Sequence, residues 1–112
     1  MKLSEKKCIP CERDDIQPLS CEDVQTILTS SQGDIAGWII NDACTHLTLE
    51  KLFPDFVTAM QWVNKVAEIA ESEGHHPDIS IWYNRVGLDM WTHSIGGLSE
   101  NDFIVAAKIN EL

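Results

Sequence analysis

An apolar stripe between residues 55 and 72 constrains the fold of this chain more than any other feature of its sequence. Apolar side chains recur there every three or four residues, which is the period of one face of an α-helix. Gly74 follows as a C-terminal stop. We therefore expect a helix from about Asp55 to Ser72 that buries one face, formed by Phe56, Ala59, Met60, Val63, Val66, Ala67 and Ala70.

A shorter helix is expected on each side of this one. Ser20 and Asp23 have the spacing of a capping box ahead of an apolar stripe, so a first helix should begin near Ser20 and end about Gly33. Ser99 as N-cap and Asp102 at the third helical position mark the start of a last helix. The chain therefore predicts three helices.

The segments between the helices suit β-strands. Residues 38–40 and 45–53 form a first pair, and residues 80–85 and 88–93 form a second pair with a turn near Val86-Gly87. Both connections are short, so both pairs should be hairpins. In the last strand one face should carry Leu88, Met90 and Thr92, and the other Asp89, Trp91 and His93.

The resulting element order, αββαββα, predicts an α+β fold. We expect a four-stranded, mostly antiparallel sheet with three helices on one face. Residues 20–112 would form this single domain, and 112 residues are enough for it to bury a core. Residues 1–19, with two prolines and a charge run, are expected to form an irregular N-terminal arm.

Charge and hydropathy restrict the partners. The 18 acidic and 8 basic side chains give a formal net charge of −10, which repels phosphate backbones, so no nucleic acid is expected as a partner. No stretch is apolar enough to span a membrane, and the basic start of the chain lacks the apolar core of a secretory signal. We expect a cytoplasmic protein.

The four cysteines are expected to be reduced, because nothing else in the sequence indicates secretion. Cys8-x-x-Cys11 has the spacing of half a zinc or redox motif, but the chain has no second such pair. Cys21, Cys44 and His46 could complete a site only if the fold brought them together. No metal is therefore predicted.

Three of the four histidines fall within 19 residues: His75, His76 and His93. Imidazole can donate and accept protons near neutral pH. Gly74 ends the helix before His75, and Pro77 forces His76 out of helical conformation. The backbone can therefore kink there, and both imidazole rings can reach one pocket. The cluster is a candidate site for acid–base chemistry.

Three motifs around these histidines resemble the signature of the pterin-4a-carbinolamine dehydratases. The family pattern is His-His-Pro, Tyr-Asn-x-Val, and Thr-His followed by Gly-Leu-Ser/Thr and an Asp. Without detectable changes in spacing, the chain carries Glu73-Gly-His-His-Pro77, Trp82-Tyr-Asn-Arg-Val86 and Trp91-Thr-His-Ser-Ile-Gly-Gly-Leu-Ser-Glu-Asn-Asp102. The resemblance covers residues 20–112, and its element order agrees with the one derived above.

The resemblance implies a metal-free and cofactor-free hydro-lyase, 4a-hydroxytetrahydrobiopterin dehydratase, in tetrahydrobiopterin recycling. His75 and His93 would be the main proton-transfer pair, His76 would position the substrate and assist, and Asp102 would orient or charge-stabilise a histidine. Homodimers or homotetramers are implied as well. The implied catalytic residues are His75, His76, His93 and Asp102, and the implied substrate-binding residues are His75, His76, Pro77, Thr92, His93, Ser94 and Ile95.

Structural explanations remain open for several of these residues. Asp102 is also an ordinary capping acid, and one carboxylate can do both jobs. Trp82, Tyr83 and Trp91 could stack on a flat pterin, but strand aromatics more often belong to a core or a subunit contact. Glu71 could pair with His75 or could be an exposed helical acid.

Two other functions are compatible with the same residues. Three histidines and a carboxylate suit a metalloenzyme, although they lack the usual i, i+4 or H-x-H ligand spacing. A non-catalytic binding module is the second alternative, because relatives of the family in animals resemble a dimerisation cofactor of a homeodomain transcription factor. Retention of all three histidines favours catalysis.

Overall fold

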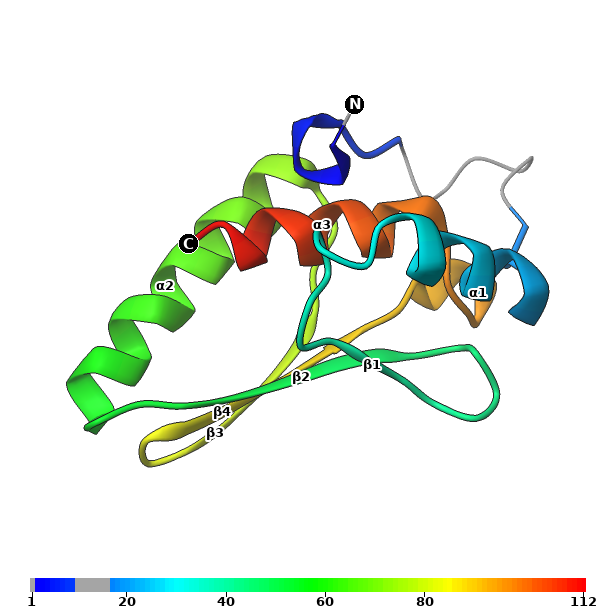
Figure 1. Ribbon diagram of the computed structural model, residues 1–112. Coiled ribbons are helices and arrows are strands. Elements are labelled where there is room, and N and C mark those ends of the chain that lie inside the picture. Colours follow the sequence, from blue (N-terminus) through cyan, green and yellow to red (C-terminus); the bar gives the residue numbers. More distant parts are fainter. Residues whose placement is uncertain (1, 10–16) are drawn as a thin grey trace.

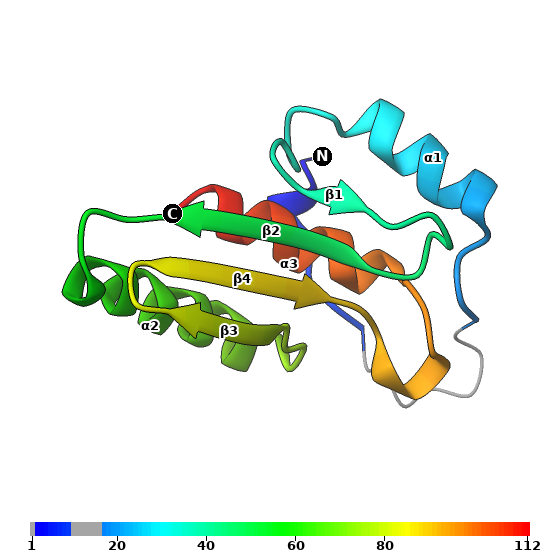
Figure 2. The same ribbon diagram turned by 90° about the horizontal axis from the view of Figure 1, so that it is seen from below.

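The computed structural model describes residues 2–9 and 17–112. An antiparallel sheet forms one layer, and the helices lie over one of its faces (Figure 1). The strands pair in the order β1-β2-β4-β3 (Figure 2), which confirms the α+β class and the order αββαββα. The elements are α1 (Cys21–Ser30), β1 (Ile39–Ile40), β2 (Leu47–Leu52), α2 (Phe56–Glu73), β3 (Asp78–Trp82), β4 (Arg85–Met90) and α3 (Glu100–Asn110).

Local capping explains where the first two helices begin and where α2 ends. The Ser20 hydroxyl accepts a hydrogen bond from the Asp23 N–H, as the sequence predicts. The Asp55 carboxylate accepts the Thr58 N–H at the start of α2, and this bond holds the pKa of Asp55 below its ordinary value. Gly74 ends α2 in the left-handed conformation, with φ of 66°, which fixes the direction in which the chain leaves toward the histidines.

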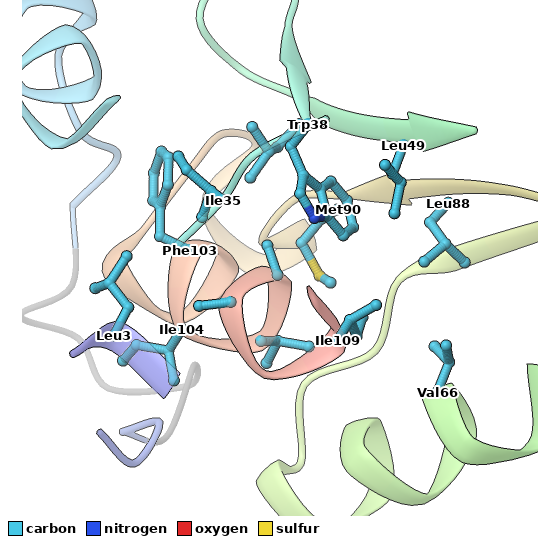
Figure 3. Packing of buried hydrophobic residues seen from close by; sticks show 14 of the residues in the cluster. Leu3, Ile35, Trp38, Leu49, Val66, Leu88, Met90, Phe103, Ile104 and Ile109 are labelled. Carbon is cyan, nitrogen blue, oxygen red and sulfur yellow. The ribbon is translucent and has the colours of Figure 1, made fainter. Parts of the chain in front are cut away.

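The core is centred on α3, which is buried on nearly all sides. Side chains from the sheet, from α2 and from the N-terminal segment converge on it (Figure 3). Leu88 and Met90 of β4 and Thr92 beyond it are buried, whereas Asp89, Trp91 and His93 are not, so the predicted alternation is confirmed. The Thr92 hydroxyl donates to Asp102, so the first turn of α3 lies beside the end of β4.

The first described residues pack along α3. Residues 2–9, which we call the N-terminal strap, include a 3₁₀ turn at Leu3–Glu5 and lie against that helix (Figure 1). Asn101 accepts the Ile9 N–H (3.0 Å) and donates to the Ile9 carbonyl (2.7 Å). The Glu73 carboxylate at the end of α2 accepts the Cys8 N–H at 2.9 Å. The strap therefore links the two helix ends that flank the histidines.

The second hairpin turns three residues earlier than predicted. The turn lies at Tyr83-Asn84, where Tyr83 has φ of 51°, and not at Val86-Gly87. The Asn84 side chain donates to the Phe53 carbonyl, which supports this position. Gly87 lies inside β4, and a Cβ atom there would stand 3.3 Å from the Trp82 ring, so this glycine makes room for the indole.

The apolar stripe of α2 is confirmed in its middle but not throughout. Ala59, Val63, Val66 and Ala70 are buried, whereas Phe56 is 46% exposed and lies off the covered face. Ala67 is also exposed, and Met60 is partly buried. The sequence prediction omitted Trp62, which is buried and packs against the Phe53 ring at a centroid distance of 5.4 Å.

The expectation of reduced cysteines is wrong for one pair. Cys21, at the start of α1, and Cys44, in the β1–β2 connection, form a disulfide with their Cα atoms 5.2 Å apart. Sequence spacing did not indicate this contact, because only the tertiary fold brings the two segments together. Cys11 lies outside the described residues, so the Cys8-x-x-Cys11 pair is not described. Within residues 2–9 and 17–112, no helix is long and apolar enough to cross a membrane.

Candidate active site

The three predicted histidines surround one pocket between the end of α2 and the segment after β4. The pocket has a volume of about 270 Å³. His93 begins a short 3₁₀ turn, His93–Ile95, and does not end a strand as predicted. Ile95 belongs to this turn but is not among the residues that line the pocket, and its role in binding stays a prediction. The lining residues are Gly74, His75, His76, Pro77, Asp78, Trp91, Thr92, His93 and Ser94.

His75 is the buried member of the cluster. Its backbone N–H still reaches back to the Ala70 carbonyl (3.1 Å), so the left-handed Gly74 turns the chain without leaving that donor unpaired. The side chain is only 5% exposed, and its Nε2 lies 2.6 Å from Asp102 Oδ1. A short contact between two buried groups fixes the orientation of the imidazole.

Asp102 makes the contacts expected of a capping acid and also contacts a histidine. The carboxylate is fully buried at the first turn of α3. Its Oδ2 accepts the Ser99 N–H (2.9 Å), which completes the capping box, and also accepts the Thr92 hydroxyl (2.7 Å). Its Oδ1 remains for His75. One side chain therefore joins a helix cap to a candidate catalytic histidine.

His76 is held differently. Pro77 is buried and directs His76 outward, where its side chain is 57% exposed. Its Nε2 lies 2.7 Å from Glu71 Oε1, so Glu71 pairs with His76 and not with His75. This pair is solvated, so its electrostatic contribution is screened. His76 is therefore more accessible to a ligand, and less constrained, than His75.

His93 lies across the pocket, with 55% of its side chain exposed. Its ring packs against Trp91, with ring centroids 4.1 Å apart, and its Nε2 is 3.6 Å from Asp78 Oδ2. Trp91 lines the pocket, whereas Trp82 and Tyr83 lie at the far end of the β3–β4 hairpin and do not. Of the three aromatics considered for stacking, only Trp91 lines the histidine pocket.

The fourth histidine, His46, does not line this pocket. Its Nδ1 lies 2.9 Å from Asp89 Oδ1, and its ring contacts Trp91 at a centroid distance of 4.8 Å. Among the described residues, no group of three or more His, Cys, Asp or Glu side chains is arranged to hold a metal ion.

Sequence reasoning missed Asp78 as a pocket residue. The available signal was an acidic residue directly after Pro77, at a point where the chain leaves a kink. Its contact with the Trp91 indole N–H (3.0 Å) depends on the register of β3 against β4, in which Asp78 is paired with Asp89. Because the turn was predicted in the wrong place, that register could not be derived.

The arrangement is suited to moving protons. Around one cavity it places a buried imidazole backed by a carboxylate and two solvent-accessible imidazoles, each close to a carboxylate. The flat indole face of Trp91 adds an apolar surface that suits a planar ring. General acid and base groups within reach of one ligand are the requirement for an elimination.

Comparisons with known proteins match one family over most of the chain. The family model described as Pterin 4 alpha carbinolamine dehydratase matches residues 17–112. A Rickettsia bellii (strain OSU 85-389) protein named putative pterin-4-alpha-carbinolamine dehydratase is 44% identical over 110 residues, which are 98% of this chain and 93% of that protein. The match to pterin-4-alpha-carbinolamine dehydratase 2, mitochondrial, of Arabidopsis thaliana is 43% identical and covers 98% of this chain and 58% of that one.

A solved structure gives the same result at the level of the fold. The crystal structure of a transcriptional coactivator/pterin dehydratase from Brucella melitensis superposes with a TM-score of 0.74 at 32% identity. The superposition covers 85% of this chain and 97% of that one. The chain belongs to the pterin-4a-carbinolamine dehydratase family, and it is accordingly a hydro-lyase that dehydrates a pterin.

Proposed function

We propose that this protein converts 4a-hydroxytetrahydrobiopterin, or a closely related pterin, to the quinonoid dihydropterin by histidine acid–base catalysis. The hydroxyl leaves carbon 4a as water after it accepts one proton, and the adjacent ring nitrogen loses one proton as a carbon–nitrogen double bond forms. The observation that carries the proposal is that three imidazoles meet at one pocket and the most buried of them is bound to a fully buried carboxylate.

The proposed roles follow from the different environments of the histidines. His75 and His93 are the proton-transfer pair. Asp102 acts as a positioning residue, because it fixes the His75 ring and compensates the positive charge that the imidazole gains when it accepts a proton. His76, exposed and paired with Glu71, contacts substrate and assists. Pro77, Thr92, Ser94 and Ile95 are proposed to complete the binding site.

The direct test follows dehydration of freshly generated 4a-hydroxytetrahydropterin by absorbance. His75→Ala and His93→Ala should each slow the reaction by about 10- to 1,000-fold, because a positioned acid or base contributes about 10²- to 10⁴-fold and water or a neighbouring imidazole can partly substitute. Lys65→Ala, on the exposed side of α2, is the control and should keep the wild-type rate. Wild-type activity of His75→Ala would contradict the role of that residue.

A chelator separates this mechanism from a histidine-bound metal. Dialysis against a strong chelator should leave both rate and fold unchanged, because the proposed steps require only proton transfer. Stoichiometric zinc or iron in active protein, with activity lost on its removal, would contradict the proposal. We propose further that the enzyme serves tetrahydrobiopterin recycling in the cytoplasm as a homodimer or homotetramer, although one relative is named as mitochondrial.

A further inference from the structure

Trp91 and Asp78 form a support beside His93. The Trp91 indole N–H donates to Asp78 Oδ2 at 3.0 Å. The same oxygen lies 3.6 Å from His93 Nε2. One carboxylate oxygen therefore faces both the indole N–H and the imidazole, and the two rings are in contact, with centroids 4.1 Å apart and an interplanar angle of 59°.

The support is itself anchored on the sheet. Trp91 directly follows β4, and Asp78 is the first residue of β3, where it is paired with Asp89 of the neighbouring strand. The Trp91 ring also contacts His46, whose Nδ1 lies 2.9 Å from Asp89. The backbones of Trp91 and Asp78 are therefore fixed by the sheet or its immediate extension. The indole is held by the hydrogen bond from its N–H to Asp78 and by its ring contact with His46.

His93 needs such a support because of where it lies. It begins a single 3₁₀ turn and more than half of its side chain is exposed, so its rotamer is not imposed by burial as that of His75 is. An exposed side chain samples several staggered rotamers unless specific contacts select one. A proton-transfer group must lie within hydrogen-bonding reach of its substrate, and misplacement of an ångström slows catalysis.

We propose that Asp78 and Trp91 are positioning residues that hold the His93 imidazole in the rotamer facing the pocket. The proposal rests on the function assigned to His93 above. It differs from a role of Trp91 as a stacking surface for the pterin. Removal of a stacking surface weakens substrate binding, whereas removal of a support for His93 lowers the turnover of substrate that is already bound.

The first test compares kcat with KM. Asp78→Ala and Trp91→Leu should each lower kcat by about 3- to 30-fold, with KM changed by no more than about twofold. Asp78→Asn keeps an oxygen that can accept the indole N–H, so it should restore kcat to within about threefold of wild type. The matched controls are Trp82→Phe, on the exposed end of β3, and Asp42→Asn, on an exposed loop, and both should behave as wild type.

A double-mutant cycle shows whether Asp78 acts through His93. Asp78→Ala should slow the wild-type enzyme but should have no further effect in a His93→Ala background. If the two losses multiply, or if Asp78→Ala leaves kcat unchanged while His93→Ala lowers it, the support is refuted and the proposed function stands. If His93→Ala is fully active, the assignment of His93 fails first, and the two failures are therefore distinguishable.

Proton NMR gives a readout that does not depend on turnover. The indole should shift the His93 ring protons through its ring current, and these signals are identified by their loss in His93→Ala. Trp91→Leu should move them toward the values of a solvated histidine, whereas Trp91→Phe should retain part of the shift. Unchanged His93 signals in Trp91→Leu would overturn the proposal.

Discussion

Asp102 binds the buried His75 ring through one carboxylate oxygen and the cap of α3 through the other. Asp102→Asn should therefore impair catalysis more than folding. The amide oxygen can still accept the Ser99 N–H and the Thr92 hydroxyl, but its NH₂ group would then face His75 Nε2 and would force that nitrogen to be an acceptor. We expect kcat to fall by about 10- to 100-fold, with a small change in the melting temperature.

The matched control for Asp102→Asn removes the hydroxyl of the helix cap, together with its 2.8 Å contact with the Thr92 hydroxyl. Ser99→Ala keeps the carboxylate on His75 but loses the hydroxyl of the capping box, which costs about 1 kcal/mol of stability. This variant should lower the melting temperature while its kcat stays within a few-fold of wild type. If Asp102→Asn and Ser99→Ala show the same ratio of lost activity to lost stability, Asp102 is only a capping acid.

The lowered pKa of Glu73 predicts that the folded protein loses stability in acid. Burial favours the neutral form of this carboxyl, but the hydrogen bond from the Cys8 N–H and the positive charges of Lys108 and Lys7 outweigh it, so the pKa of Glu73 lies below its ordinary value of 4.5. A lowered pKa stabilises the folded state above the unfolded-state pKa, and that stabilisation disappears as the pH falls through the folded-state pKa.

Urea unfolding of Glu73→Gln against pH checks this. At pH 6 the variant should be less stable than wild type, and the difference should shrink as the pH is lowered past about 4.5 toward 3. Glu68→Gln, on the exposed side of α2, is the control and should follow the wild-type curve. A stability difference that stays constant with pH would mean that the charge of Glu73 does not hold the N-terminal strap.

The Cys21–Cys44 disulfide should contribute measurably to stability. It closes a loop with a sequence separation of 23, for which the chain-entropy relation gives about 3 kcal/mol. Addition of a reductant should lower the urea midpoint of the wild-type protein, whereas Cys21→Ser should already have the lower midpoint and should not respond to reductant. A wild-type midpoint that is insensitive to full reduction would contradict the prediction.

Exposed apolar side chains on the strands predict self-association. Ile39, Leu52 and Trp82 are 68%, 74% and 51% exposed, and Ile79 and Ile81 on the edge strand β3 are each 38% exposed. An open edge next to large apolar groups is normally covered by another chain. Sedimentation at micromolar concentration should therefore give a dimer or a dimer of dimers. A clean monomer mass at that concentration would contradict this.

The parts of the fold that the sequence predicted are those determined by near neighbours. The helix over residues 55–72, the Ser20 cap and the Ser99/Asp102 box involve residues within a few positions of one another. The structure confirms the helix and both caps, and it confirms the buried stripe in the middle of that helix. The prediction failed at the second hairpin because glycine is common in turns, so the turn was predicted at Gly87. In the structure Gly87 lies in β4, where the absence of a side chain leaves room for the Trp82 ring. Tyr83 adopts the left-handed conformation at the turn.

In the candidate site, too, the sequence predicted features set by neighbouring residues and missed those set by tertiary contacts. The kink at Gly74 and Pro77 and the identity of the three histidines could be read along the chain, and the family motifs named Asp102. The partners of these groups could not, because each pairing depends on tertiary packing. The Asp102–His75 contact joins α3 to the end of α2, and the Asp78–Trp91 contact depends on a strand register that was predicted with its turn in the wrong place.

The position of β4 has a consequence for how the chain folds during synthesis. β4 is the last strand made, yet it lies in the middle of the sheet, where it pairs with β2 on one side and β3 on the other. Until β4 leaves the ribosome, β2 presents one unpaired edge, and α3, which follows β4 in the chain and fills the centre of the core, is absent as well. Pairing of Leu47 with Met90 also closes a long loop, which slows folding. The nascent chain is therefore most prone to aggregate just before its last quarter emerges, and a truncation that removes α3 should yield insoluble protein, not a smaller folded domain.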